Sequence, residues 1–493
     1  MWNRIGPISV SARQRVVAAV LMRLHNMREG IITVVAIVGG AGLAFGLYSP
    51  SQDLTIAIAG TSVYLVTILI APLKGLLLWM VTQPVLERYL NISLGYGIPD
   101  LSLSRLCIAL ITVLLLARAA VRLQRLQPVN KFDIVVLAFM VGMFQTGFRE
   151  TGGMRSFQLI FDHYFIPVLT YFAVKNLVSD RRSMYLVFYA ILFMALYSAV
   201  YAIYETTTGN VLLLKRQDTL FFYREAGLRI LRGIWGSNFA FGRVFIMAIP
   251  ILFYLYLKTS SPSRKFFWAI CLALVFGGMY LTYKRAAWIA TVAVTFLMQF
   301  FYPQFRRLFI VLLVIVAVAI AFYGDRITDS TVYTSRIKSE SSTIEGRTEG
   351  WENGIEVWST SPLRGIGVRQ YTRRAIKAGY ADHDLESEHL EILVSAGLFG
   401  FLPYIGWLLL MVYDGYRHYR GWVAGSLADP DLIAVFWGIL LGYVITVSTS
   451  QVNNMVIIAM LFAVAGAVIY ARREAVSTQP EIRPESVNIV PLT

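Results

Sequence analysis

Apolar blocks of near bilayer length alternate with short polar breaks along almost the whole chain. Each block is long enough, or nearly so, to cross about 30 Å of hydrocarbon as a helix that rises about 1.5 Å per residue. The pattern therefore predicts an all-α polytopic membrane protein with about 14 spans, and with 12 as the alternative. The expected limits are 31–48, 54–72, 75–90, 101–117, 132–148, 158–177, 183–204, 238–257, 266–283, 286–303, 308–323, 391–413, 432–449 and 455–471.

The third of these spans, 75–90, carries Pro84, Glu87 and Arg88 near its end. It therefore also fits a re-entrant or interfacial helix. Residues 1–30 are basic and interrupted by charges, which predicts a cytoplasmic lead-in and no cleavable signal peptide.

The distribution of Lys and Arg predicts the orientation. If the N-terminus is cytoplasmic and the spans alternate, every short inner connection is basic, whereas the short outer loops 49–53 and 450–454 hold no Lys or Arg. Both termini are then cytoplasmic. The inner cations are Lys74, Arg118, Arg122, Arg125, Lys131, Arg181, Arg182, Lys258, Arg264, Lys265, Arg306, Arg307, Arg417, Arg420, Arg472 and Arg473.

Two expected outer segments are too long for simple turns, and the longer one has room for a helical extracytoplasmic subdomain. The predicted organisation is a cytoplasmic N-terminus (1–30), spans one to seven (31–204), a first outer loop (205–237), spans eight to eleven (238–323), a large catalytic outer loop (324–390), spans twelve to fourteen (391–471) and a disordered cytoplasmic tail (472–493).

Composition supports a membrane protein, because 57% of the residues are hydrophobic and only 15% are charged. The net charge of +15 is explained by cytoplasmic loops that contact anionic lipid, so we expect no nucleic-acid partner. The only cysteines, Cys107 and Cys271, lie inside apolar blocks, which excludes a disulfide scaffold and a cysteine metal site.

The segment Tyr283 to Trp288 places Lys284 and Arg285 at the expected outer end of a span. Cations there are unusual for the positive-inside pattern. They fit either side chains that snorkel to the interface or a clamp for a phosphate or pyrophosphate headgroup.

The run Gly346 to Trp358 predicts a short amphipathic helix. Trp351, Ile355 and Trp358 share one face of it, with Arg347 one turn earlier on the same side. The turn Pro362-Leu363-Arg364-Gly365-Ile366-Gly367 follows, and its glycines allow close approach of backbone to a ligand.

Ionisable residues crowd 382–389, at the mouth of the next span. Carboxylates and imidazoles such as Glu386, His383 and His389 are the usual general bases. If the helix begins near Ser387, its dipole favours Glu386 and Glu391. A metal site is conceivable from His383, Asp384, Glu386 and His389, but the excess of Arg nearby argues against cation binding, and we expect no metal.

Further polar residues mark the spans themselves. Arg232 precedes the entry Gly236-Ser237-Asn238, and Arg243 lies about a turn and a half inside an apolar stretch, where an Arg usually faces a cavity or a partner. Asp162 and His163 form a second intramembrane polar pair, which also fits an ordinary interhelical hydrogen bond.

These pieces, in this order, resemble the O-antigen ligase/polymerase superfamily of bacterial membrane glycosyltransferases. Arg285 to Trp288 is similar to the family's Arg, small residue and Trp, and Arg347 with Trp351 is similar to the opening of its long outer loop. The turn 362–367 and the closing Gly397-Leu398-Phe399-Gly400 also resemble the family pattern. The resemblance covers roughly Arg232 to Tyr413.

The resemblance implies transfer of a polyprenyl-diphosphate-linked oligosaccharide on the outer face of the bacterial inner (plasma) membrane, without a cofactor, onto another glycan or a lipid core. Arg285 and Arg347 would hold the diphosphate, with support from Arg364, Arg232 and Arg243. Glu386 stands where the ligases carry a His, so either Glu386 or a neighbouring His383 or His389 would be the base. This departure favours an exopolysaccharide or O-antigen polymerase over a ligase.

A transporter or flippase of lipid-linked glycans would also need outer cations and about fourteen spans. It should place charges near the bilayer midplane and on both sides, whereas here they gather on one face. A membrane sensor is a third reading, but the predicted cytoplasmic tail contains no signalling domain.

Overall fold

The computed structural model describes most of the chain. The described residues are 52–87, 100, 102–148, 154–211, 224–225, 228–229, 231, 233–303, 306, 310, 340–368, 370–379, 385–422, 426–452 and 454–471. The predicted spans 31–48 and 308–323 lie outside them, as do Arg232 and His383.

The described part of the chain is helical apart from one antiparallel ladder of two-residue strands, β1 (Arg224–Glu225) and β2 (Leu228–Arg229). The helices that precede β1 are α2 (Gln52–Ile70), α3 (Pro72–Leu86), α4 (Leu103–Ala120), α5 (Lys131–Gly147), α6 (Met154–Ile160), the π-helix η1 (Phe161–Phe165), α7 (Ile166–Leu177) and α8 (Arg181–Thr208). Those that follow β2 are α9 (Asn238–Lys258), α10 (Pro262–Leu281), α11 (Arg285–Phe301), α14 (Glu340–Ser359), α15 (Tyr371–Lys377), α16 (Glu388–Arg420), α17 (Pro430–Val447) and α18 (Met455–Val468).

Helices occupy every predicted span that falls within the described residues, so the all-α fold is confirmed there. Seven of these helices are long and apolar enough to cross a membrane: 103–120, 156–177, 181–208, 238–258, 262–281, 388–420 and 430–447. The helices at 60–70, 285–301 and 455–468 are apolar but shorter. The count of fourteen spans stays a prediction.

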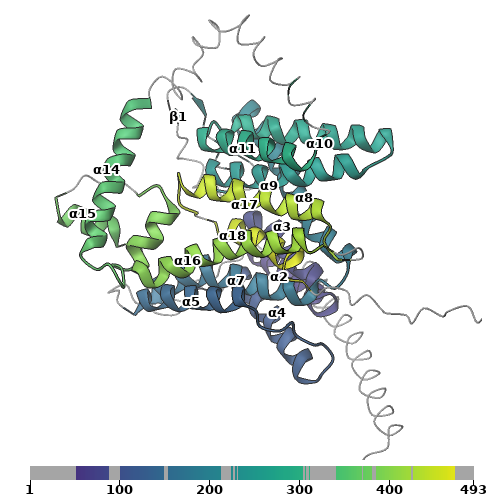
Figure 1. The fold of residues 1–493 in the computed structure, drawn as a ribbon, viewed down its shortest axis with the longest axis horizontal. Coiled ribbons are helices and arrows are strands. Elements are labelled where there is room, and N and C mark those ends of the chain that lie inside the picture. Colours follow the sequence, from purple (N-terminus) through teal and green to yellow (C-terminus); the bar gives the residue numbers. More distant parts are fainter. Residues whose placement is uncertain are drawn as a thin grey trace, which may run out of the picture.

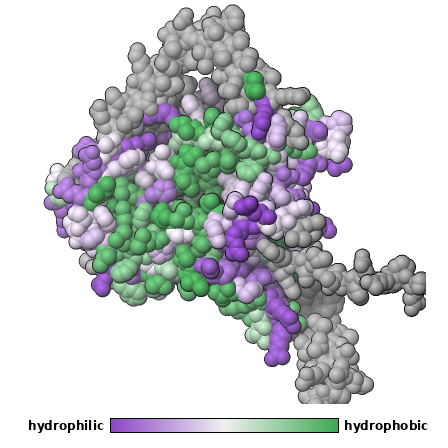
Figure 2. All heavy atoms as spheres, viewed as in Figure 1, coloured by the Kyte–Doolittle hydropathy of each residue, from purple (hydrophilic) through white to green (hydrophobic). Residues whose placement is uncertain are grey.

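The bundle has a buried centre and an apolar rim. In the most apolar stretch of α9, 89% of the residues are buried. In that of α10, only 22% are buried. Large apolar side chains such as Phe267 and Ile270 on α10 are therefore exposed. Figure 2 shows hydrophobic side chains gathered over the middle of one face of the molecule, with hydrophilic side chains to either side of them. This distribution is that of a membrane protein whose rim faces lipid.

Two boundaries differ from the sequence prediction. Helix α8 continues to Thr208 and ends at Gly209, whose φ of 74° is left-handed. Glu205, which was expected to open the first outer loop, is consequently a buried residue of α8. Gly is the residue that ends helices in this way because it has no Cβ. The span 158–177 is also interrupted, since Phe161–Phe165 forms a π-helix.

One end of the bundle carries a small helical subdomain. Helix α14 stands across the direction of the bundle helices, with α15 beside it, beyond the start of α16 (Figure 1). A second apolar cluster, separate from the bundle core, holds it together and includes Val357, Tyr371 and Leu385. The described part of the second long loop is thus helical, and its place outside the membrane stays a prediction.

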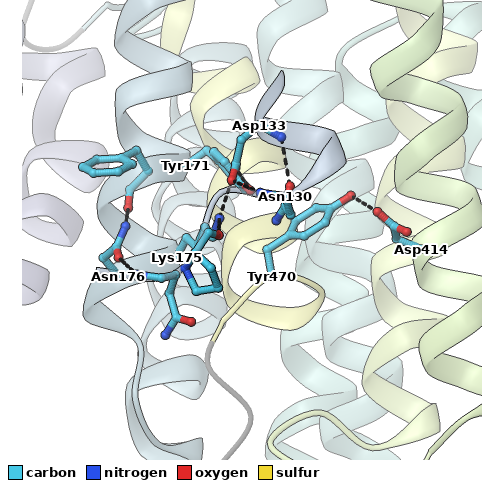
Figure 3. A network of polar contacts seen from close by, with 10 residues as sticks. Asn130, Asp133, Tyr171, Lys175, Asn176, Asp414 and Tyr470 are labelled. Carbon is cyan, nitrogen blue, oxygen red and sulfur yellow. Dashed lines mark hydrogen bonds and ion pairs between the residues drawn. The ribbon is translucent and has the colours of Figure 1, made fainter. Parts of the chain in front are cut away.

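The opposite end of the bundle collects several of the predicted inner connections. Arg181 pairs with Asp429, and Lys258 pairs with Asp431, so three connections meet there. A further network ties α5 to α7 at this end, where buried Lys175 donates to Asp133 over 2.6 Å and Tyr171 donates to the same carboxylate (Figure 3).

Candidate functional site

Arg347 and Glu386 are in direct contact. The Arg347 Nε donates to Glu386 Oε2 over 2.5 Å, which joins α14 to the segment just before α16. The two side chains are 27% and 42% exposed, so the pair is open to solvent. Glu386 has a φ of 41°, a left-handed conformation that is uncommon outside glycine. The structure thus brings together the residue predicted to bind diphosphate and the residue predicted to act as base.

Helix α14 forms as predicted, but of the three apolar residues that share one of its faces only Trp358 packs against the second apolar cluster. Trp351 and Ile355 are 38% and 51% exposed, whereas Asn353, Gly354 and Val357 are buried. The physical reason is the glycine: a Cβ at Gly354 would come within 2.5 Å of the Leu385 side chain. Small residues on this face let the chain before α16 approach closely, so Trp351 remains at the edge and donates its indole N–H to the carbonyl of Leu385.

The turn 361–367 docks into a break in α16. Gly397 lies inside this helix with φ 61° and ψ −161°, which opens the helical hydrogen-bond ladder. The freed carbonyls of Val394 and Ser395 accept from the backbone N–H groups at 366 and 367. In return, the N–H groups at 398 and 399 donate to the carbonyls at 362 and 363. Every one of these bonds is 2.9 to 3.0 Å long.

The role expected for the glycines in the turn is therefore corrected. They allow backbone to approach backbone, where close approach to a ligand was expected. A Cβ at Gly365 would lie 2.3 Å from the carbonyl oxygen of Ser395. Two motifs that are separate in sequence thus form one structural unit that positions the start of α16. Arg364 lies in this turn and is exposed.

Helix α16 begins at Glu388 with Ser387 as its N-cap, as predicted. Glu388 is buried, and both of its oxygens are engaged: one accepts from Tyr164 and the other from the N–H of Val452. His389 is similarly held, because its two ring nitrogens contact the hydroxyls of Tyr404 and Ser448. These contacts turn His389 into the bundle, toward α17.

Arg243 faces a partner, as expected for an Arg at that depth. Its guanidinium donates to the carbonyls of Ser450 and Gln451 and to the Ser450 hydroxyl, over 2.6 to 3.0 Å. The residue is 2% exposed. The contacts hold the segment that follows α17. Asp162 likewise forms an interhelical ion pair, with Arg105 of α4, which confirms the simpler alternative for that residue.

Arg285 is the first residue of α11, and Lys284 is its N-cap. The first turn of α11 contains no acidic residue. A helix N-terminus attracts anions through its first backbone N–H groups. At the start of α11 the cations Lys284 and Arg285 add to this effect. The Lys284 ammonium lies 4.0 Å from the ring centre of Phe239, next to the Gly236-Ser237-Asn238 entry, and Asn238 donates to the carbonyl of Thr282. Two more of the sequence motifs are therefore neighbours.

The chain is thus a polytopic helical membrane protein, and the candidate site, the Arg347–Glu386 pair, lies in a subdomain at one end of the bundle. Residues 269–405 match the family model of the O-Antigen ligase, and this match supports the resemblance of the segment to the O-antigen ligase/polymerase superfamily. The matched segment contains Arg285, Arg347, Arg364 and Glu386, whereas Arg243 precedes it. No curated protein matches the chain.

Proposed function

We propose that this protein is a glycosyltransferase of the bacterial inner membrane that polymerises polyprenyl-diphosphate-linked glycan repeats on the outer face. The observation that carries the proposal is the contact between Arg347 and Glu386. It unites an anion-binding group and a proton acceptor within the segment that matches the O-Antigen ligase model.

The diphosphate of the donor takes the place of Glu386 on Arg347. A guanidinium binds two phosphate oxygens at once through its planar fork, which gives charge-assisted bonds that a single Nε contact to a carboxylate does not match. Arg285, at the N-terminus of α11, supplies further positive charge for the same leaving group. Neutralising the diphosphate stabilises the transition state in which it departs.

Glu386, once released from Arg347, accepts the proton of the acceptor hydroxyl. The hydroxyl oxygen forms a bond to the anomeric carbon of the donor sugar, and the bond from that carbon to the diphosphate oxygen breaks. Polyprenyl diphosphate leaves with the electron pair. Glu386 is preferred to His389 as the base because both ring nitrogens of His389 are engaged within the bundle. Arg243 is left out of the diphosphate site because its donors hold backbone carbonyls.

The test is Arg347→Ala in cells that depend on this chain for surface glycan. We expect the amount of long glycan to fall about 100-fold or more, in line with the loss of one donor to transition-state charge. Arg374→Ala is the matched control, because Arg374 is an exposed cation on α15 of the same subdomain. Equal glycan from Arg347→Ala and wild type at equal protein level would overturn the clamp.

Purified protein distinguishes the candidate reactions. A polymerase given only lipid-linked repeats produces longer lipid-linked chains. A ligase leaves those repeats unchanged and transfers them only when a lipid core is added. A transporter moves the repeats across a vesicle membrane and forms no new glycosidic bond.

A further inference from the structure

A small cavity, partly open to solvent, lies at the start of α16. The π-helix η1, the first turns of α16, Val368 after the glycine turn and the segment 451–452 form its walls. A smaller space borders it and shares Tyr164 and Glu388 with it. The sequence motifs did not single out Tyr164, whose place is decided by the π-helix.

The cavity is close to the proposed reaction centre. Ser387 is extended, with φ −146° and ψ 123°. From Glu386 to Glu388 the chain therefore covers at most about 7 Å, since an extended residue spans about 3.3–3.6 Å. A sugar ring in the cavity would have its neighbour in the glycan within reach of Glu386.

Hydrogen-bonding groups line this space. Glu391 accepts from the Ser395 hydroxyl over 2.8 Å, and the Gln451 amide approaches its second oxygen at a longer 3.4 Å. His163 and Tyr164 add further polar atoms, and Leu159, Val368 and Val452 supply apolar wall. Polar side chains thus outnumber apolar ones among the described lining residues, which suits a ligand rich in hydroxyl groups.

The charges of the lining residues select the kind of ligand. No Lys or Arg is among the described residues that line the cavity, whereas Glu388 and Glu391 are, so a phosphate or an acidic sugar is disfavoured. The described residues also contain no group of three His, Cys, Asp or Glu placed to hold a metal ion. Carboxylate and amide oxygens accept hydrogen bonds from hydroxyl groups, and the apolar wall suits the C–H face of a pyranose ring.

We propose that this cavity binds a neutral sugar of the acceptor glycan through its hydroxyl groups, with Glu391 as a specificity-determining residue. The inference rests on the proposed function and assigns it an acceptor subsite. Glu388 acts as fixed wall, because it is buried and its oxygens are engaged by Tyr164 and Val452. Glu391 is only partly buried.

The test uses full-length protein in lipid nanodiscs. Methyl glycosides of glucose, galactose, mannose and rhamnose are titrated as neutral probes, methyl glucuronide as an acidic probe and inorganic pyrophosphate as the anionic probe. Saturation-transfer NMR gives the Kd of each glycoside, and calorimetry gives that of pyrophosphate. We expect at least one neutral glycoside to bind, and Glu391→Ala to weaken it about tenfold, as for loss of a hydrogen bond to a charged group. Glu356→Ala, which removes an exposed carboxylate of α14, is the control.

Failure of this inference and failure of the proposed function give different results. If no neutral glycoside binds wild type, if Glu391→Ala leaves its Kd unchanged, or if methyl glucuronide binds more tightly, the acceptor subsite is wrong. If Arg347→Ala leaves the pyrophosphate Kd unchanged, the diphosphate site is wrong. We expect Glu391→Ala to leave pyrophosphate binding at the wild-type value.

A second variant guards against loss of fold. Val368→Trp fills the cavity from its apolar wall without removing any polar group. It should abolish binding of the neutral glycoside while the thermal unfolding midpoint and the pyrophosphate Kd stay at the wild-type values. Retained glycoside binding in this variant would overturn the proposal.

Discussion

The strength of the contact between Arg347 and Glu386 depends on how far the two side chains are exposed to solvent. The side chain of Arg347 is 27% exposed, and that of Glu386 is 42% exposed. An ion pair in contact with water contributes only about 0.2–1 kcal/mol to stability. Under the proposed function, a diphosphate would therefore displace Glu386 at little cost. The pair fits a rest state that holds both groups in place until the donor arrives.

The identity of the base yields a prediction at this scale. Glu386→Gln should lower the turnover of purified protein by about 100-fold or more, because general-base catalysis contributes about 10²–10⁴. His389→Ala should reduce the unfolding midpoint, since it removes the contacts to Tyr404 and Ser448, while the folded fraction stays active. The reverse pattern, an active Glu386→Gln with an inactive but stable His389→Ala, would identify His389 as the base.

Backbone hydrogen bonds hold the turn 361–367 against helix α16 at the break in that helix. Inside a bundle, each backbone group that a helix break leaves unbonded costs free energy, and here the turn engages those groups. The break therefore sets where α16 begins and, with it, where Glu386 lies.

This joint predicts a strong effect for Gly397→Ala. A Cβ at Gly397 would lie 2.4 Å from the backbone nitrogen of Gly365, and its φ of 61° is unfavourable for Ala. We expect loss of folded protein in detergent extracts, measured by size-exclusion chromatography. Gly277→Ala in α10 is the control, because no heavy atom lies within 4 Å of the methyl group it would add and Ala favours helix. Equal yields from the two variants would contradict the role of the break.

The network in Figure 3 gives a second prediction for elements. Asp133→Asn leaves the buried Lys175 ammonium without its carboxylate, which should cost about 3–5 kcal/mol of stability. Asp133→Asn with Lys175→Met should recover most of the unfolding midpoint, because the unpaired charge is then gone. A double variant as unstable as the single one would show that the charge is not the cause.

The whole molecule has two chemically different ends. The α14–α15 subdomain lies at one end, and Arg181, Lys258, Asp429 and Asp431 meet at the other. An excess of Lys and Arg in short connections marks the cytoplasmic side. We therefore predict that the subdomain with Arg347 and Glu386 faces outward, where lipid-linked glycan is assembled under the proposed function.

Labelling with a membrane-impermeant maleimide tests this orientation. Ser359→Cys, exposed on α14, should react in intact spheroplasts, whereas Arg182→Cys, exposed at the start of α8, should react only after lysis. The native Cys107 and Cys271 are buried and should give little background. Labelling of Arg182→Cys in intact spheroplasts would invert the topology and place the site in the cytoplasm.

The sequence by itself determined the helices of the bundle and the small helix that carries Arg347. Period, length and charge act locally along the chain, and a helix satisfies its own backbone, so these features need no knowledge of distant contacts. The order of the motifs also predicted the family whose model matches residues 269–405.

Only the tertiary structure decided which groups meet. Gly354 and Gly365 let distant segments come into contact, and Trp351 is left at the edge. Separately, packing of the bundle engages His389 and Arg243, and Glu386 lies against Arg347. Such pairings depend on the close fit of surfaces far apart in sequence, which no local pattern encodes. The sequence therefore determined the elements and the kinds of residue at the site, whereas packing determined which of those residues can act together.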